Sequence, residues 1–278
     1  MRRSPTALCV AALLPLLLFV VCPRVASAQD EGVFDNYAQA LRSPEKVRRL
    51  VLTGEESAGW KRFPPGLGNL VNLEGLEVAC MEKLDALPEE LGRLNRLEEI
   101  VIDNGNGCAM NVTLPRSIGR LSNLRVLRLY GALDGRDIGL DARKGRSRSL
   151  PDSLAELQKL EELDLGRNGL VTLPPQVASL RGLKKLALDY NDIRDLPAFV
   201  GELPNLEELS LNANGGVRLP QSLAGRRGLK IFMGNNRLTL AAQRQLRARF
   251  PNATFNFENE YDDDAANQEA PKPRRRGR

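Results

Sequence analysis

"LEELDLGRNGLVTLPPQVASLRG" (160–182) is followed directly by two segments of the same length, "LKKLALDYNDIRDLPAFVGELPN" (183–205) and "LEELSLNANGGVRLPQSLAGRRG" (206–228). Aligned, the three segments share the frame LxxLxLxxNxLxxLPxxLxxLxx. A frame that recurs with a fixed period of a few tens of residues is typical of solenoid proteins, whose units bury their apolar residues against one another. The repeat therefore predicts one elongated domain with a continuous core.

The frame continues on both sides of these segments, with irregular lengths on the N-terminal side. Further units begin at Val47, Leu73, Leu97, Leu124 and Leu229. Together with the three regular segments, they make eight repeats between residues 47 and 239. The fourth unit also carries an insertion. The irregular units thus occupy residues 47–159, and the regular ones lie after them.

Both ends of a solenoid need atypical units that shield the core from water. We expect an N-terminal cap at 29–46 that is helical from about residue 36. The C-terminal cap is expected at 240–257 and consists of a helix followed by a short strand. Residues 258–278 combine low hydrophobicity with segregated charge, which predicts a disordered charged tail.

This frame resembles the leucine-rich repeat family. It is most similar to the LP-containing 23-residue type of the Ras-suppressor, Scribble and plant intracellular Ras-group-related proteins. The resemblance implies an α/β fold, a curved horseshoe solenoid with a parallel β-sheet on its concave face and a helical cap at each end. It also implies that the protein is an interaction module.

The asparagine of the frame follows the predicted strand, where its amide side chain can satisfy backbone groups that a turn leaves unpaired. We interpret these asparagines as structural: Asn168, Asn191, Asn214 and Asn236. The second, third and fourth repeats have Met81, Gly105 and Ala132 at this position.

The N-terminus has the pattern of a cleaved signal peptide. Arg2 and Arg3 precede the apolar run 7–21, and Ala-Ser-Ala (26–28) supplies a cleavage site. We expect a mature protein that begins near Gln29 and is secreted or located in the periplasm or cell envelope, and the alternative is an uncleaved anchor. An arginine to lysine ratio of 31 to 9 suggests a GC-rich, bacterial genome.

Removal of residues 1–28 would leave two cysteines, Cys80 and Cys108. An even pair in an oxidising compartment favours a disulfide over a metal site or a nucleophile. We predict that Cys80 and Cys108 are bonded to each other.

The composition argues against most catalytic classes. The chain has no histidine, which excludes Ser-His-Asp and Cys-His nucleophile pairs and the commonest zinc ligand. Its glycine-rich stretches lack the phosphate-binding GxxxxGK pattern, and its paired glutamates recur at one repeat position, as surface residues do. We expect a protein that is not an enzyme and needs no cofactor or metal.

Net charge and patterning also limit the partners. Residues 29–257 carry a net charge of about +3, without the basic face of a nucleic-acid binder or a basic amphipathic helix for a membrane surface. We therefore expect no nucleic-acid partner and no membrane span in the mature chain.

The third, fifth and seventh frame positions should face the concave side. Tyrosines among acidic and amide groups there suggest a protein-binding surface, because aromatic residues contribute disproportionately to interfaces. The candidate binding residues on and beside the strands are Glu99, Asp103, Arg128, Tyr130, Asp164, Asp189, Tyr190, Ser210 and Asn212. The alternative to a protein-binding surface is a face that is merely soluble.

The insertion within residues 131–149 is rich in glycine and arginine and poor in apolar residues. It cannot belong to a core, so we expect a projecting basic loop, and Arg143 and Lys144 complete the set of candidate binding residues. The alternative is a neutral insertion that the fold tolerates and that has no role in binding.

These observations predict a non-catalytic exported leucine-rich repeat protein that mediates protein–protein interaction through the concave face and the 131–149 loop. The alternative is a structural or envelope-associated protein that binds glycan or an anionic surface polymer.

Overall fold

The computed structural model describes residues 32–54, 59–104, 111–133 and 150–258. Four predicted features lie outside these residues: the signal peptide, the charged tail apart from Glu258, most of the 131–149 insertion and Cys108. Among the residues described, no helix is long and apolar enough to cross a membrane.

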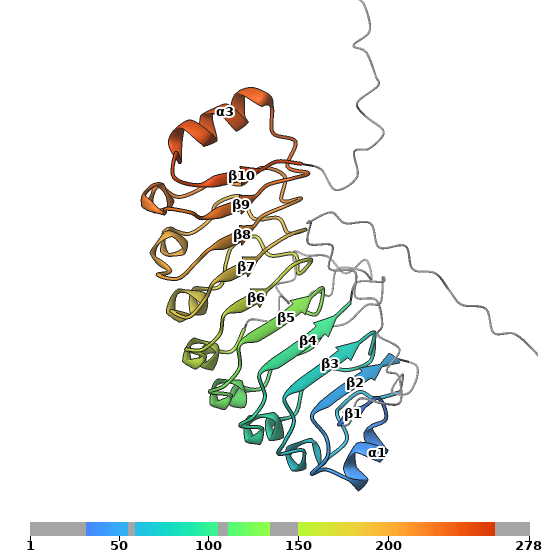
Figure 1. Ribbon diagram of the computed structural model, residues 1–278. Coiled ribbons are helices and arrows are strands. Elements are labelled where there is room, and N and C mark those ends of the chain that lie inside the picture. The colour runs from blue at the N-terminus through green and yellow to red at the C-terminus, as the bar shows by residue number, and fades with distance from the viewer. Residues whose placement is uncertain (1–31, 55–58, 105–110, 134–149, 259–278) are drawn as a thin grey trace, which may run out of the picture. The chain divides into compact units, whose positions relative to one another are not determined.

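Ten parallel strands form one sheet in which each strand pairs with its neighbours in the sequence (Figure 1). The strands are β1 (Val33–Phe34), β2 (Arg49–Thr53), β3 (Gly75–Ala79), β4 (Glu99–Asp103), β5 (Val126–Tyr130), β6 (Glu162–Asp164), β7 (Lys185–Ala187), β8 (Glu208–Ser210), β9 (Lys230–Phe232) and β10 (Thr254–Asn256). This order confirms the predicted parallel sheet of a leucine-rich repeat solenoid.

The register of the sheet places the same frame position of each repeat side by side. Leu127 of β5, for example, lies between Ile100 of β4 and Leu163 of β6. Side chains alternate between the two faces of a strand, so leucines, isoleucines and valines enter the core while the residues between them line the concave face. One continuous apolar core runs from Tyr37 to Phe255.

Short 3-10 helices return the chain on the other side of the core (Figure 1). They are η1 (Leu67–Asn69), η2 (Glu89–Arg93), η3 (Arg116–Arg120), η6 (Asp152–Glu156), η7 (Pro175–Ser179), η8 (Ala198–Glu202) and η9 (Gln221–Gly225). The proline of each Leu-Pro pair directly precedes a helix from η2 onward, as Pro197 precedes η8 with φ −60°. Proline fixes φ near this value, while the preceding leucine, such as Leu196, is buried. The structural interpretation of the Leu-Pro pairs is consistent with this geometry.

Both caps contain the predicted helices. Helix α1 (Tyr37–Arg42) begins after Asn36, whose side chain accepts a hydrogen bond from the Gln39 amide. The sequence pattern missed strand β1, which adds the first strand to the sheet ahead of the eight repeats. The ring of Tyr37 packs edge-on against Trp60 and Phe63 and covers this end of the core.

At the other end, α3 (Leu240–Arg249) and β10 follow the last repeat. Thr239 caps the helix by accepting a hydrogen bond from the Ala242 amide. The helix itself has no buried residue, and the side chain that closes the core is Phe250, which is fully buried just after it.

The turn asparagines form a ladder that joins neighbouring repeats. The amide of Asn191 donates to the carbonyl oxygens of Leu165 (3.0 Å) and Leu188 (2.9 Å), and its oxygen accepts from the amides of Asn168 and Leu170. Equivalent bonds are made by Asn168, Asn214 and Asn236. Each of these side chains therefore satisfies backbone groups of its neighbouring repeat, as predicted.

The irregular repeats satisfy their turns differently. Met81 and Ala132 are fully buried and join the apolar core, and Gly105 lies outside the described residues. The third repeat uses Asn104, one position earlier, which donates to the Gly131 carbonyl of the following repeat (3.1 Å). The frame alignment missed this buried amide because it assumed a constant strand-to-turn spacing.

Candidate functional site

The predicted binding residues on the strands lie on the concave face of the sheet. Glu99 and Asp103 stand on β4, Arg128 and Tyr130 on β5, and Asp164 on β6; Ser210 is on β8, and Asp189 and Asn212 follow β7 and β8. Tyr190 follows Asp189 and lies beyond the concave residues. Its backbone adopts the left-handed conformation, with φ 55°, and 36% of the residue is exposed.

Ion pairs connect residues of strands β2, β4, β5 and β6 across the concave face. Arg128 is central: its Nε lies 2.6 Å from Glu162 and its Nη1 lies 3.8 Å from Glu99, which also pairs with Arg49. Burial disfavours the charge on Arg128, but Glu162 and Glu99 outweigh it and hold the pKa of the guanidinium above its usual value. Part of the acidic charge here is therefore already neutralised.

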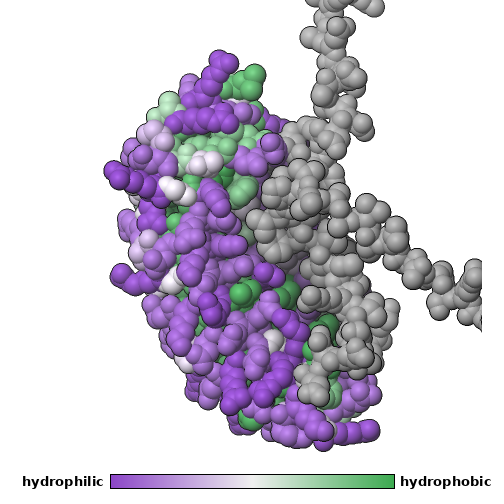
Figure 2. Space-filling model, viewed as in Figure 1, coloured by the Kyte–Doolittle hydropathy of each residue, from purple (hydrophilic) through white to green (hydrophobic). Residues whose placement is uncertain are grey.

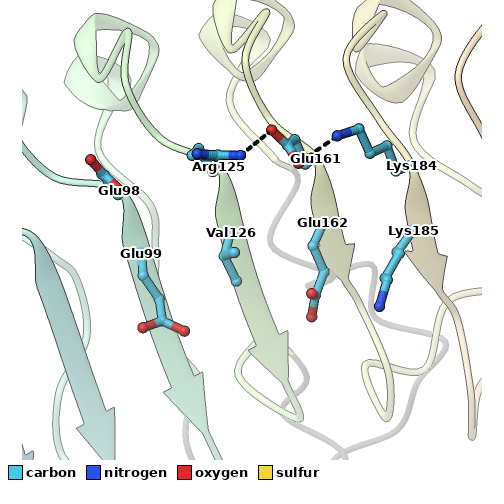
Figure 3. Close-up of a pocket in the computed structure, with 8 residues that line it drawn as sticks. All are labelled: Glu98, Glu99, Arg125, Val126, Glu161, Glu162, Lys184 and Lys185. Carbon is cyan, nitrogen blue, oxygen red and sulfur yellow. Dashed lines mark hydrogen bonds and ion pairs between the residues drawn. The ribbon is translucent and has the colours of Figure 1, made fainter.

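A second row of ion pairs lies at the beginning of the strands. Figure 3 shows Glu161 between Arg125 (2.7 Å) and Lys184 (2.8 Å), on the rim of a shallow pocket. The other residues that line it are Glu98, Glu99, Val126, Glu162 and Lys185. Acidic and basic side chains alternate along this pocket, which gives it no strong preference for one charge.

Tyr130 lies near the carboxylates of Asp103, Asp164 and Asp189 at the opposite ends of the strands. Burial and the charges of Asp189 and Glu162 raise the pKa of Asp164 to about 7, and they outweigh the Gly166 amide and Arg128, which lower it. Burial, together with the nearby Asp164, Asp189 and Asp103, raises the pKa of Tyr130 to about 12, although the positive charge of Arg167 acts in the opposite direction. We call Tyr130, Asp103, Asp164 and Asp189 the acidic patch. A cationic group placed beside Asp164 would favour its charged form.

Three predicted residues form one hydrogen-bonded group beside this patch. Asp189 Oδ1 accepts from the Ser210 hydroxyl and from the Asn212 amide, both at 2.6 Å. The side chain of Asn212 donates to Ser210 and accepts from the Gly234 amide. This part of the concave face is therefore fixed in place by its own contacts.

Two concave glycines leave room for long side chains to cross a strand. A Cβ at Gly166 would lie 2.8 Å from the ring of Tyr130, and one at Gly75 would lie 3.1 Å from the guanidinium carbon of Arg49. Arg49 reaches over β3 to Glu99 for this reason. Sequence analysis missed Arg49, although a glycine at a concave frame position signals such a crossing.

Part of the predicted site cannot be placed. Arg143, Lys144 and Cys108 lie outside the described residues. Cys80 is disulfide-bonded and adopts φ 52° just after β3, but its bond to Cys108 stays a prediction. Among the described residues, no group of histidine, cysteine, aspartate or glutamate side chains has the arrangement of a metal site.

Residues 158–215 match the family model described as Leucine rich repeat. The protein carries leucine-rich repeats. Such repeats generally serve as scaffolds for binding proteins. The relation of these leucine-rich repeats to the LP-containing type, and their bacterial and exported origin, stay predictions.

The curated relatives share only a segment with this leucine-rich repeat chain. TMV resistance protein N of Nicotiana glutinosa is 33% identical over 58% of this chain and 15% of its own length. Uridine 5'-monophosphate transferase of Xanthomonas campestris pv. campestris is 33% identical over 35% of this chain and 19% of its own length. The chain thus spans less than a fifth of either relative.

One solved structure supports the fold, and a second is reported beside it. An internalin (inlF) from Listeria monocytogenes has a TM-score of 0.51 at 20% identity, over 77% of this chain and 61% of that chain. The ectodomain of the Arabidopsis receptor kinase HAESA has a TM-score of 0.48 at 20% identity, over 73% of this chain and 32% of that chain. The first likeness shows a shared solenoid fold and nothing about the ligand.

Proposed function

We propose that this is an exported, non-catalytic leucine-rich repeat protein that binds a protein partner through its concave face, with the 131–149 loop as a second contact. The acidic patch is the observation that supports this most directly. It combines a half-buried aromatic ring with three carboxylates, and burial, Asp189 and Glu162 disfavour the charge of one of them, Asp164. Complementary charge on a partner favours fast and selective association.

The rigidity of the face supports the same proposal. The ion pairs of Arg128 and the Asp189–Ser210–Asn212 group hold the surface in one arrangement before a partner arrives. A preorganised surface loses less conformational entropy on binding than a flexible one.

A variant with Tyr130→Ala and Asp164→Asn tests the proposal. Proteins captured by the mature chain from secreted or periplasmic material would be identified by mass spectrometry, and their affinity would be measured with purified components. We expect a partner whose affinity falls at least tenfold with the variant and is unchanged by Glu202→Gln, an exposed carboxylate on η8. A partner that binds all three proteins equally would show that the concave face is not the binding surface.

Export has its own test. N-terminal sequencing of secreted or periplasmic material should find a chain that begins near Gln29, whereas an intact Met1 would contradict the proposed cleavage.

A further inference from the structure

Charge is segregated along this chain in a way that the net charge conceals. Residues 209–257 contain no acidic residue and eight basic ones: Arg218, Arg226, Arg227, Lys230, Arg237, Arg244, Arg247 and Arg249. Residues 32–208 hold 27 acidic and 24 basic residues. The last part of the solenoid and its cap therefore carry a charge of +8, next to a region of −3.

Few of these bases are neutralised. Arg218 pairs with Asp195 and Lys230 with Glu208. Within the described part of the chain, the other six make no ion pair with a carboxylate. Arg226 donates to the carbonyl oxygens of Pro204 and Leu206, and Arg249 donates to Gln221, contacts that leave the positive charges uncompensated.

Four of the arginines lie on or beside α3, at the end of the solenoid (Figure 1). We call Arg237, Arg244, Arg247 and Arg249, all exposed, the basic end surface. Arg244 and Arg247 are three residues apart on one helix and so lie on the same side of it. Hydrophilic side chains project from this end of the molecule in Figure 2.

Aromatic rings help to hold two of these guanidinium groups. Arg247 lies 4.8 Å from the centroid of the Phe257 ring, which stacks on Phe255. Arg249 lies 5.3 Å from the centroid of Phe250. These contacts with aromatic rings favour fixed positions for the guanidinium groups of Arg247 and Arg249.

The surroundings decide what kind of anion fits. Single-stranded nucleic acid is bound by aromatic rings on which bases stack, but Phe250 and Phe255 are buried and Phe257 is covered by Arg247. A protein interface or a membrane surface needs an apolar centre or an apolar helix face. The large apolar side chain exposed on α3 is Leu240, while Leu246 packs against the core, so the two do not form such a face.

We propose that the basic end surface binds an anionic polymer whose negative groups are phosphate or sulfate. The planar fork of a guanidinium matches these groups with two parallel hydrogen bonds. The surface lies on the cap, apart from the acidic patch on β4–β7, so it would let the protein hold a polyanion and a concave-face partner together.

The test compares two charge reversals of equal size in the mature chain, with inorganic polyphosphate and dextran sulfate as probes. One variant is Arg244→Glu with Arg247→Glu. The matched control is Arg93→Glu with Arg96→Glu, two exposed arginines on the N-terminal half. All proteins carry glutamine at the basic positions of 271–278, so that binding of the polyanion to these residues does not dominate the measurement. The acidic residues at 260–264 are retained, so that any competition between them and the polyanion is included.

We expect affinity for polyphosphate to fall at least tenfold in the first variant and less than threefold in the control. The slope of log affinity against log salt concentration should also decrease by about one for each phosphate that the variant no longer binds. Arg244→Gln with Arg247→Gln guards against a charge reversal that disturbs the helix. This variant removes the charges without reversing them and should lower the affinity for polyphosphate by the same order. Tyr130→Ala with Asp164→Asn should bind polyphosphate normally, which separates this surface from the concave face.

Equal reductions in affinity in the two reversals would show that only net charge matters and would overturn the proposal. So would tighter binding to phosphatidylglycerol vesicles or to a DNA oligonucleotide than to polyphosphate at the same phosphate concentration, because the surface would then recognise a membrane or a nucleic acid.

Discussion

At the scale of the residue, the turn asparagine illustrates why one amino acid recurs. Its side chain must donate and accept at the same time: Asn191 donates to the Leu165 carbonyl and accepts from the amides of Asn168 and Leu170. Aspartate would lose the donor and alanine would lose both functions. The buried setting makes the removal of each bond costly, because no water replaces it.

Asn191→Ala should therefore lower the free energy of unfolding by about 2–4 kcal/mol, since several buried backbone groups would lose their partner. Asn205→Ala is the matched control, because the Asn205 amide makes one exposed hydrogen bond to the Arg181 carbonyl, and it should cost about 1 kcal/mol or less. Urea denaturation measures both. Equal costs would mean that the ladder is not a special source of stability.

Asp164→Asn should stabilise the protein at high pH. The pKa of Asp164 is raised from 3.8 to about 7 by burial and by neighbouring carboxylates. The folded state thus binds the proton more tightly than the unfolded state, so the stability due to this group is present at low pH and is lost as pH rises from about 4 to 7.

Asparagine keeps the oxygen that accepts from the Gly166 amide (2.8 Å) and cannot ionise. Urea denaturation should show the variant to be more stable than the natural protein at pH 8, with a smaller difference at pH 4.5. A difference that does not change with pH would contradict the assignment.

At the scale of the element, the 3-10 helices are linked by glutamates as well as by core contacts. Glu89 of η2 accepts from the amides of Arg116 and Ser117 in η3, at 3.0 and 2.9 Å. Glu90 accepts from the amides of Gly66 and Gly68 at η1. Two adjacent carboxylates thus satisfy the unpaired N-terminal amides of helices on either side.

Deletion of residues 134–147 should leave folding nearly unchanged. Gly131, Ala132 and Leu133 on one side and Leu150 on the other already occupy their places in the repeat, with Ala132, Leu133 and Leu150 buried. Shortening a polar loop costs little closure entropy. The midpoint of thermal unfolding should move by only a few degrees, while affinity for a protein partner falls. Normal affinity would leave recognition to the concave strands alone.

At the scale of the whole molecule, one sheet and one core connect all repeats, so a cavity at one position should weaken the entire array. Leu163 is fully buried on β6, between Leu127 and Leu186 of the neighbouring strands. Leu163→Ala should cost about 2–5 kcal/mol, and unfolding should keep a single transition. Val171→Ala, at a side chain that is 69% exposed, is the control and should change little. Two separate transitions in the first variant would show that the repeats are not one cooperative unit.

The predicted Cys80–Cys108 bond would join the second and third repeats, which lack the regular turn asparagine. Closing a loop of this length should contribute about 3 kcal/mol by restricting the unfolded chain. Thiol labelling of the unreduced mature protein should find no free cysteine, and peptide mapping should find these two residues linked. Two reactive thiols would contradict the bond.

The repeat frame alone was enough to predict the parallel sheet, the caps at α1 and α3, the buried leucines and the bonding role of Asn168 and Asn191. These follow from local spacing, because alternation along a strand and a fixed period decide which side chains meet. The same logic placed Glu99, Arg128 and Asp164 on one face.

Tertiary structure decided what spacing does not encode. Strand β1 pairs with β2 ahead of the first repeat, next to helix α1. In the third repeat, Asn104 takes the role of the frame asparagine, because the turn of this repeat lies one residue earlier than the frame position of Gly105. Arg49 meets Glu99 across strand β3 only because Gly75 leaves space. The pKa of Asp164 depends on burial and on neighbouring repeats, which exist only once the chain is folded. The surplus of bases in 209–257 is visible in the sequence, but their exposure and their contacts with Phe250 and Phe257 are decided by the fold.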